Sequence, residues 1–443
     1  MDPRLLTYAE RPAPRYTSYP PAPHFSGAIG PSTTAAWLAE IAADATLSLY
    51  LHVPYCRQLC WYCGCNTFAA RREEPVREFV DAVLHEVDLV SEALSGQSVV
   101  EIHWGGGTPN ILSASQFAAI ATRLANRFDL TALRHHAIEL DPRHIVPDNV
   151  RAYVAAGVSR ASLGVQDMNQ TVQQAIGRVQ PFETVRDAVT TLKAEGIDEI
   201  SMDLMYGLPH QTVTAVEQTV QLAAEMKPNR IALFGYAHVP WVKKRQRLIP
   251  EASLPNASER FAQAEAARAA LEARGYVAIG LDHFALPSDE LAIAANTDQL
   301  TRSFQGYVLK SASALVGLGP SAISTLPQGY TQNDADPGAW RRAVASGALA
   351  TVRGHALSRD DRLRRKLVEQ IMCDFVGDLG PLGGVRACVD ELDALSPMIA
   401  DGMVRIVDDH IVLSAAARPF CRLVAMAFDT YAQRGAARHS SAV

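Results

Sequence analysis

Hydrophobic positions in the first 300 residues alternate between short β-branched runs and longer stretches of helical periodicity. Helical spacing is clearest at Val76, Phe79, Val80, Val83, Val87 and Val90. The β-branched runs predict strands at 48–54, 99–104, 136–140, 160–166, 199–207 and 230–237, and helical patterns follow the later strands near 114–128, 147–156, 181–195, 213–226 and 258–274. This order predicts an α/β fold, a partial (β/α)6 TIM-like barrel over 48–300.

The two ends of the chain differ from this middle. Residues 1–47 are rich in Pro, Ala, Tyr and Thr, with one helical stretch at 33–43, and are interpreted as an N-terminal arm or lid. Residues 301–443 contain amphipathic helices at 357–375 and 389–402, a hairpin at 403–414 and a last helix at 418–433. Helix, helix, hairpin and helix predict a small, mostly helical, winged-helix-like domain that covers the barrel mouth.

Polar side chains stand where the predicted strands end. Cys56 follows the first strand, three glycines follow the second, Glu139 and Gln166 end the third and fourth, Asp203 lies near the end of the fifth, and Ala237 ends the sixth. Active sites of (β/α) barrels form at the carboxyl ends of the strands. We therefore expect these groups to share one site, although any single one could be a satisfied core residue.

Charge and composition exclude several partners. The formal charge is −6, which argues against nucleic acid as a main partner. No apolar run is long enough for a transmembrane helix, and the first residues lack a secretory signal. We expect a cytoplasmic monomer that does not bind membranes. Reduced thiols are the rule in that compartment, so clustered cysteines indicate metal binding or catalysis.

Four of the seven cysteines lie within ten positions, as C-x3-C-x2-C-x-C. Cys56, Cys60 and Cys63 on one loop can hold three irons of a [4Fe–4S] cluster and leave the fourth iron open for chemistry. The alternative is a structural zinc site, but zinc favours two separated cysteine hooks and the chain has no second one. Cys373, Cys388 and Cys421 are interpreted as buried packing residues.

Two further motifs have both a structural and a functional interpretation. Gly105, Gly106 and Gly107 could simply form a tight turn, or their amides could approach a small-molecule cofactor. The basic run at 243–247 could be a solvated loop or the counter-charge of a polyanionic substrate.

The cysteine spacing after a first barrel strand resembles the radical S-adenosylmethionine superfamily. PRYTSYP, YCRQLCWYCGCN, HWGGGTPN, SLGVQD, MDLMYGLP, YAHVP, GLDHFA, SFQGY and GLGPSAIS, which span nearly the whole chain, are similar to the oxygen-independent coproporphyrinogen III oxidases (dehydrogenases). Pro21, Met168 and Ala314 depart from the usual residues of that family, all outside the cluster motif.

The resemblance implies a [4Fe–4S] cluster on Cys56, Cys60 and Cys63 and two S-adenosylmethionine molecules. The first would contact Tyr50, Gly106, Glu139 and Ile323, and the second Tyr62, Gly107, Thr108, Gln166, Arg178, Asp203 and Ala237. Cys65, Tyr62 and Glu139 would be catalytic, and Cys65 is not a cluster ligand in this pattern.

The implied reaction converts two propionates of coproporphyrinogen III to vinyl groups through a 5′-deoxyadenosyl radical, giving protoporphyrinogen IX, with an unidentified electron donor and acceptor. Arg15 and the basic run at 243–247 would suit the substrate carboxylates. The alternatives are a haem-trafficking protein, a radical enzyme acting on another porphyrin or haem, and a cluster-bearing scaffold without chemistry. Cys65 and the N-terminal arm speak against the trafficking protein.

Overall fold

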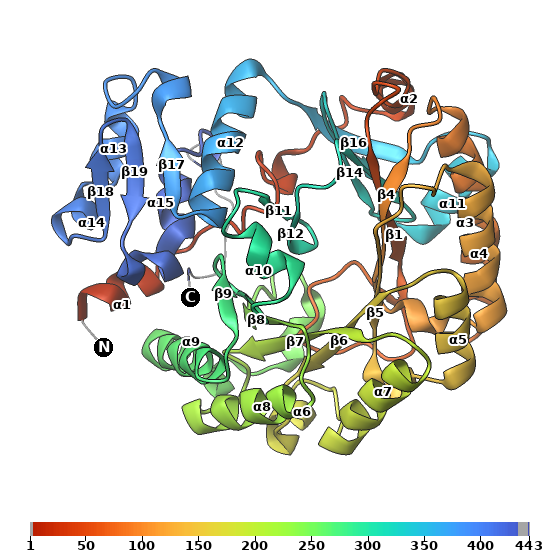
Figure 1. Cartoon of the computed structure of the whole chain (residues 1–443), viewed down its shortest axis with the longest axis horizontal. Coiled ribbons are helices and arrows are strands. Elements are labelled where there is room, and N and C mark those ends of the chain that lie inside the picture. The colour runs from red at the N-terminus through yellow and green to blue at the C-terminus, as the bar shows by residue number, and fades with distance from the viewer. Residues whose placement is uncertain (1–2, 433–441, 443) are drawn as a thin grey trace.

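A twelve-stranded sheet forms the centre of the computed structural model, which describes residues 3–432 and residue 442 (Figure 1). The six expected strands lie side by side and parallel in chain order. They are β1 (Leu47–Val53), β4 (Val99–Gly106), β5 (His135–Leu140), β6 (Arg160–Gln166), β7 (Glu199–Tyr206) and β8 (Arg230–Gly235). The prediction of an α/β fold with a parallel sheet is confirmed.

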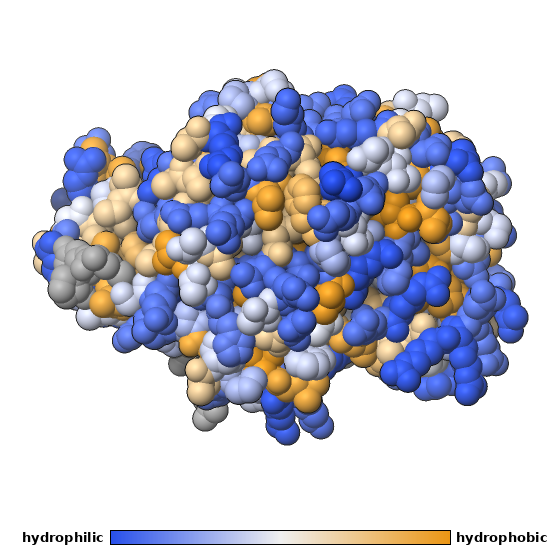
Figure 2. All heavy atoms as spheres, turned by 90° about the horizontal axis from the view of Figure 1, so that it is seen from below, coloured by the Kyte–Doolittle hydropathy of each residue, from blue (hydrophilic) through white to orange (hydrophobic). Residues whose placement is uncertain are grey.

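Helices cover the outer side of these strands (Figure 1). They are α3 (Glu74–Glu92), α4 (Ala114–Arg127), α5 (Pro147–Ala155), α6 (Gln170–Ala175), α7 (Phe182–Ala194), α8 (Val213–Glu225) and α9 (Ala257–Glu272). Trp104 of β4 packs on Phe117 of α4, and Phe117 on Tyr153 of α5, with ring centroids 4.4 and 4.6 Å apart. Figure 2 shows polar and apolar residues interspersed on the face that it presents, as expected for a layer in contact with solvent.

Both ends of the sheet carry strands that the hydrophobic pattern did not predict. Beyond β1 lie β13 (Ala314–Leu318), parallel to it, and then β14 (Ile323–Leu326), β15 (Gly329–Asn333) and β16 (Thr351–Ala356), which are antiparallel. Beyond β8 lie β10 (His283–Ala285) and β9 (Val277–Ile279), with α10 (Glu290–Ala294) after them. The proposed domain boundary at residue 300 stays a prediction, since the sheet takes strands from both sides of it.

Three further elements lie in sequence between the outer strands of the sheet but outside the sheet itself. The hairpin of β11 (Leu300–Ser303) and β12 (Gly306–Leu309) stands apart from the large sheet, and α11 (Pro337–Ala345) packs on α3.

The C-terminal part follows the expected order of helix, helix, hairpin and helix. It contains α12 (Arg359–Cys373), the short pair α13 (Val389–Ala394) and α14 (Ser396–Ala400), β18 (Val404–Val407), β19 (His410–Leu413) and α15 (Cys421–Ala427). A third strand, β17 (Val376–Asp378), pairs with β19. The last expected helix is shorter than predicted, and its final position, residue 433, lies outside the described residues.

The N-terminal arm lies against the C-terminal part (Figure 1). It carries α1 (Pro3–Ala9) and α2 (Pro31–Ala39), the latter near the helix expected at 33–43. Tyr8, Tyr16 and Tyr19 belong to the same hydrophobic cluster as Phe420 and Phe428. The arm therefore contributes core residues to a distant part of the sequence.

Cys373, Cys388 and Cys421 are buried, as their apolar surroundings predicted. Across residues 3–432, no helix combines the length and the apolar character that a membrane span requires.

Candidate active site

The cysteine motif lies on the loop between β1 and α3, at the carboxyl end of the parallel strands. Within it, β2 (Tyr55–Cys56) pairs with β3 (Phe68–Ala69). Cys56, Cys60, Cys63 and Cys65 all line one cavity of ≈440 Å³, and all four are free thiols. The loop therefore presents its sulfur atoms to a common space.

The glycine turn after β4 holds this loop in place. The Gly107 amide donates to the Val53 carbonyl oxygen at 2.7 Å and the Thr108 amide to the Tyr55 carbonyl oxygen at 2.9 Å. A Cβ atom added at Gly107 would collide with the Tyr55 backbone. The close approach of the two backbones thus explains why residue 107 is a glycine. The amides of Gly107 and Thr108 both donate to carbonyl oxygens of the protein.

Residues after β8 hold the loop from the other side. The buried Gln246 donates through Nε2 to the carbonyl oxygens of Tyr62, at 2.8 Å, and Ala237, at 3.1 Å. Lys243 Nζ donates to the Cys65 carbonyl oxygen at 3.2 Å, and Arg245 Nη2 to the Thr67 carbonyl oxygen at 3.4 Å. Part of the basic run at 243–247 therefore stabilises the cysteine loop.

The donor set suits an iron–sulfur cluster better than one metal ion. In the described residues, no three His, Cys, Asp or Glu side chains are grouped as ligands of a single ion. The thiolates of a [4Fe–4S] cluster each bind a different iron, so they stand farther apart than the ligands of one zinc ion. Cys56, Cys60 and Cys63 line one cavity, so each thiolate could bind a different iron.

Glu139 at the end of β5 connects the glycine turn to the barrel interior. Its Oε2 accepts from the Gly106 amide at 3.2 Å, and its Oε1 lies 2.9 Å from His103 Nε2. Burial by itself lowers the pKa of His103, but the hydrogen bond and the charge of Glu139 outweigh burial and raise it. Tyr50 stacks on the His103 ring at a centroid distance of 5.9 Å.

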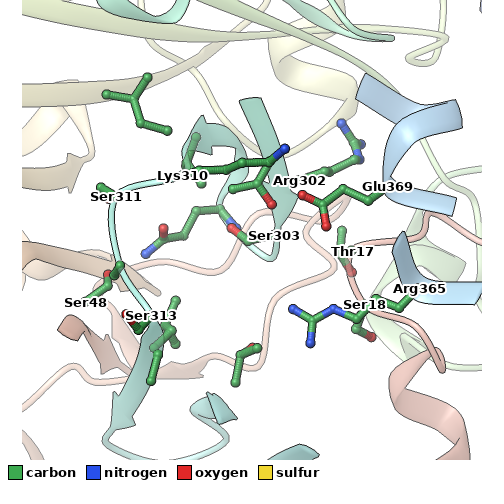
Figure 3. Close-up of a pocket in the computed structure, with 18 of the residues that line it drawn as sticks. Thr17, Ser18, Ser48, Arg302, Ser303, Lys310, Ser311, Ser313, Arg365 and Glu369 are labelled. Carbon is green, nitrogen blue, oxygen red and sulfur yellow. The ribbon is translucent and has the colours of Figure 1, made fainter. Parts of the chain in front are cut away.

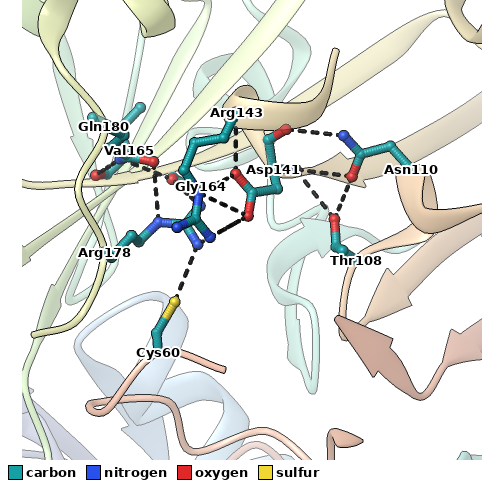
Figure 4. Close-up of polar contacts among 9 residues, drawn as sticks. All are labelled: Cys60, Thr108, Asn110, Asp141, Arg143, Gly164, Val165, Arg178 and Gln180. Carbon is teal, nitrogen blue, oxygen red and sulfur yellow. Dashed lines mark hydrogen bonds and ion pairs between the residues drawn. The ribbon is translucent and has the colours of Figure 1, made fainter. Parts of the chain in front are cut away.

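An arginine network closes the side of the cavity next to Cys60 (Figure 4). Arg178 donates to Cys60 Sγ at 3.4 Å, to Asp141 Oδ2 at 3.3 Å and to the Gly164 carbonyl oxygen at 2.7 Å. Burial alone would raise the pKa of Asp141, but its hydrogen bonds with Arg143 and the charge of Arg178 lower it to about 2. The Asp141 carboxylate thus holds Arg178 beside the sulfur of Cys60, a predicted cluster ligand.

Gln166 and Asp203 line the same cavity from β6 and β7. Gln166 has a φ of 69°, which is uncommon for a residue other than glycine and is typical of functional sites. It follows a shift in the β6–β7 register after Gly164. Burial and then the charge of Glu139 raise the pKa of Asp203 to about 7, while Ser162 Oγ lies 3.4 Å from its Oδ1.

The structure brings most of the expected cofactor-binding residues together. The cavity is lined by Tyr62, Gly106, Gly107, Thr108, Glu139, Gln166, Arg178, Asp203 and Ala237. Tyr50 and Ile323 are not among its described lining residues. Tyr50 lies on β1 and Ile323 on β14, with β13 between them: Tyr50 pairs with Gly317 of β13, and Gly317 lies close to the Ile323 backbone.

Sequence reasoning missed His103 and Asp141, which contact the predicted residues. His103 lies within β4, whereas the DPRH sequence that begins with Asp141 follows β5 directly. That position is a signal that could have found Asp141.

A second cavity, of ≈350 Å³, lies toward the amino ends of β1 and β4 (Figure 3). Ser48, Arg302, Lys310, Arg365 and Glu369 are among the side chains around it. Its described lining includes Ala314 but no cysteine and no residue expected to bind cofactor. The expected chemistry therefore belongs to the cysteine cavity.

Comparison with known proteins agrees with this site. The model of the radical SAM superfamily matches residues 50–223. The oxygen-independent coproporphyrinogen III oxidase of Bradyrhizobium diazoefficiens is 44% identical over 99% of both chains, and that of Paracoccus denitrificans is 41% identical over 97% of this chain and 96% of its own.

A solved structure gives the same result. The coproporphyrinogen III oxidase (HemN) from Escherichia coli, described as a radical SAM enzyme, superposes with a TM-score of 0.89 at 35% identity. The match covers 94% of this chain and 97% of the other. The cysteine cavity, the barrel around it and the full-length similarity together show that this chain belongs to the oxygen-independent coproporphyrinogen III oxidase family of the radical SAM superfamily.

Proposed function

We propose that this protein catalyses the anaerobic oxidative decarboxylation of coproporphyrinogen III to protoporphyrinogen IX. The observation that carries the proposal is that four free cysteines and polar side chains of β5, β6 and β7 share one cavity. Membership of the family supplies the substrate and the class of reaction. Two propionates become vinyl groups, and each loses CO2.

In this proposal Cys56, Cys60 and Cys63 hold a [4Fe–4S] cluster. Tyr50, Gly106, Glu139 and Ile323 bind the S-adenosylmethionine on its open iron. A second S-adenosylmethionine lies near Tyr62, Gly107, Thr108, Gln166, Arg178, Asp203 and Ala237. When bound, the cluster and S-adenosylmethionine supply the 5′-deoxyadenosyl radical that takes a hydrogen atom from the propionate β-carbon.

The side chains of the cavity position and protect these groups. His103 orients Glu139 by a 2.9 Å hydrogen bond, and Glu139 holds the Gly106 amide that faces the first S-adenosylmethionine in this proposal. Arg178 places positive charge beside Cys60. Cys65 has an exposed side chain in the same cavity, and we assign it and Tyr62 to the substrate side. The surrounding loops keep water from the reacting carbon.

The remaining partners are also proposals. An unidentified electron donor reduces the cluster, and an unidentified acceptor takes the electron that leaves the substrate radical. The seven free cysteines suit a reducing compartment, so we place the protein in the cytoplasm, as a monomer.

Product analysis tests the proposal. The protein with its reconstituted cluster, kept anaerobic with S-adenosylmethionine, a strong reductant and coproporphyrinogen III, should release two CO2 per substrate. It should form protoporphyrinogen IX together with 5′-deoxyadenosine. A Cys56→Ala variant should lose both the visible absorbance of the cluster and the product, because a thiolate ligand is missing.

Cys421→Ala is the matched control, since Cys421 is buried in the C-terminal part, away from the cavity. It should keep the cluster and the activity. Stoichiometric uptake of haem without CO2 release would replace the proposal by the trafficking function. Full iron and sulfide in Cys56→Ala would overturn the ligand assignment.

A further inference from the structure

A third cavity, of ≈370 Å³, lies between the barrel edge and the C-terminal part. Its walls come from the ends of β7 and β8, from α9, from the arm and from the segment that leads into α15. Tyr206 and Gly235 form the barrel side, and Arg422 the C-terminal side. The function proposed above leaves this cavity without a role.

Its described lining is rich in arginine. The basic side chains are Arg15, Arg260, Arg268, Arg302, Arg418 and Arg422, and the acidic ones are Glu265, Glu272 and Asp282. The three acids already have basic partners. Arg268 pairs with Glu265 at 2.8 Å and Glu272 at 2.9 Å. Arg302 pairs with Asp282 at 2.9 Å. The described side chains of the cavity therefore carry more positive than negative charge.

Arg15 stands where this cavity meets the cysteine cavity. Arg15 and Gly235 line both spaces, and Arg15 Nη2 donates to the Gly235 carbonyl oxygen at 2.8 Å. The side chain keeps an exposed surface toward the cavities. Burial of the site lowers the pKa of Arg15, although the charge of Asp282 opposes this effect. A bound anion would therefore help to keep the buried guanidinium charged.

We propose that this cavity binds a carboxylate-bearing arm of the substrate, and that Arg15 holds the carboxylate at the boundary with the cysteine cavity. The inference rests on the proposed function. Coproporphyrinogen III has four propionates, of which two keep their carboxylates after the reaction. A guanidinium binds a carboxylate through two parallel hydrogen bonds, which fixes orientation as well as affinity.

The basic run after β8 suits this role less well. Lys243 and Arg245 donate to backbone carbonyls of the cysteine loop, so binding substrate would cost those contacts. Arg15 donates to the Gly235 carbonyl oxygen through one nitrogen, Nη2, and its remaining N–H groups can point to the ligand.

Equilibrium binding of two probes tests the proposal. Coproporphyrin III carries four carboxylates, and its tetramethyl ester carries none, so the ratio of their dissociation constants reports recognition of charge. The natural protein should bind the acid more tightly than the ester. Arg15→Gln should weaken binding of the acid by about tenfold or more, as expected for the loss of a charge-assisted hydrogen bond, and leave the ester unchanged.

Arg15→Lys keeps the positive charge but cannot form two parallel hydrogen bonds. Its affinity for the acid should lie between those of the natural protein and Arg15→Gln. Arg186→Gln removes an exposed arginine paired with Asp187 on α7 and should match the natural protein. Equal losses for acid and ester in Arg15→Gln, or no loss, would overturn the inference. Cluster absorbance in each variant reports whether the fold persists.

The probes require no turnover, which separates this inference from the proposed function. If the protein forms protoporphyrinogen IX while its Arg15→Gln variant binds each probe as tightly as the natural protein does, the arginine cavity alone is disproved. If the protein forms no vinyl product but its Arg15→Gln variant loses binding of the acid, the proposed role of the arginine cavity stands and the proposed reaction is disproved.

Discussion

Glu139 and Asp203 both line the cysteine cavity, and their surroundings differ. Glu139 accepts hydrogen bonds from the Gly106 amide and from His103, and its side chain is 38% exposed. Asp203 lies deeper, with Ser162 Oγ 3.4 Å from its Oδ1. Burial and the neighbouring Glu139 raise the pKa of Asp203 to about 7, so its charge changes within the physiological range.

Binding of the second S-adenosylmethionine should therefore depend on pH. Below about pH 7 Asp203 is neutral and accepts hydrogen bonds less strongly, so the affinity of that site should fall several-fold from about pH 8 to about pH 6. Asp203→Asn should bind weakly across that range and show no such change. Equilibrium dialysis of S-adenosylmethionine at each pH measures both proteins.

Asp187→Asn, on the exposed face of α7, is the control and should follow the natural protein. Cluster absorbance should stay the same throughout, because no hydrogen bond joins Asp203 to the cysteines among the described contacts. An Asp203→Asn protein with the natural pH dependence would remove Asp203 from the site. Arg178 is a poorer probe, since it contacts Cys60 Sγ directly.

Among single residues, the sequence could predict those site residues that stand together in one contiguous motif. Cys56, Cys60 and Cys63 could be recognised because their spacing on one loop is itself the chemical signature. The contacts of His103 with Glu139 and of Asp141 with Arg178 could not be predicted, although Asp141 stands directly after a strand, because these contacts arise only when β4, β5 and the segment after β6 come together. Such contacts depend on strand register, which a hydrophobic pattern does not specify in a parallel sheet buried on both faces.

Among the elements, α3 follows the cysteine loop and carries a buried carboxylate. Glu86 is 1% exposed and accepts three hydrogen bonds. The donors are the Gly319 amide at 2.6 Å, Asn333 Nδ2 at 2.7 Å and Trp340 Nε1 at 2.9 Å. These partners follow β13, end β15 and lie in α11, so one side chain joins α3 to the unpredicted edge of the sheet.

Glu86→Ala should destabilise the protein by about 3 kcal/mol or more, because it leaves three buried donors without their acceptor. Urea unfolding measures the change. Burial raises the pKa of Glu86 to about 7 from its usual 4.5, so the folded state binds a proton more tightly than the unfolded state. The contribution of Glu86 to stability should thus fall as pH rises from about 4.5 through about 7, and the variant should lack this fall.

His85→Ala, on the exposed side of the same helix, should change the unfolding midpoint little. An unchanged midpoint in Glu86→Ala would mean that the three donors find other partners.

The strands next to Glu86 also show why the hydrophobic pattern did not predict β13, β14 and β15. β15 reads Gly-Tyr-Thr-Gln-Asn and is fully buried, so its polar residues are satisfied by tertiary contacts that composition does not reveal.

On the scale of the whole molecule, the N-terminal arm connects the sheet to the C-terminal part. Tyr16 and Tyr19 line the second cavity, together with Ser48 of β1. The same tyrosines pack in the C-terminal hydrophobic cluster, and Tyr16 OH donates to Asp429 Oδ2 at 3.0 Å. The sequence predicted an arm from its composition, but not its contacts, which join residues about 400 positions apart.

Tyr16→Phe should loosen the C-terminal part without unfolding the barrel. The change removes one hydroxyl and leaves the buried Asp429 carboxylate short of a donor, which costs about 1–3 kcal/mol. Amide hydrogen exchange in α15 should accelerate accordingly, while exchange in β5 and β6 stays slow. Tyr276→Phe makes the same chemical change at a hydroxyl that donates to the Pro228 carbonyl oxygen at 2.7 Å, and it should leave α15 unaffected. Equal exchange of α15 in the two variants would show that the arm does not hold the C-terminal helices in place.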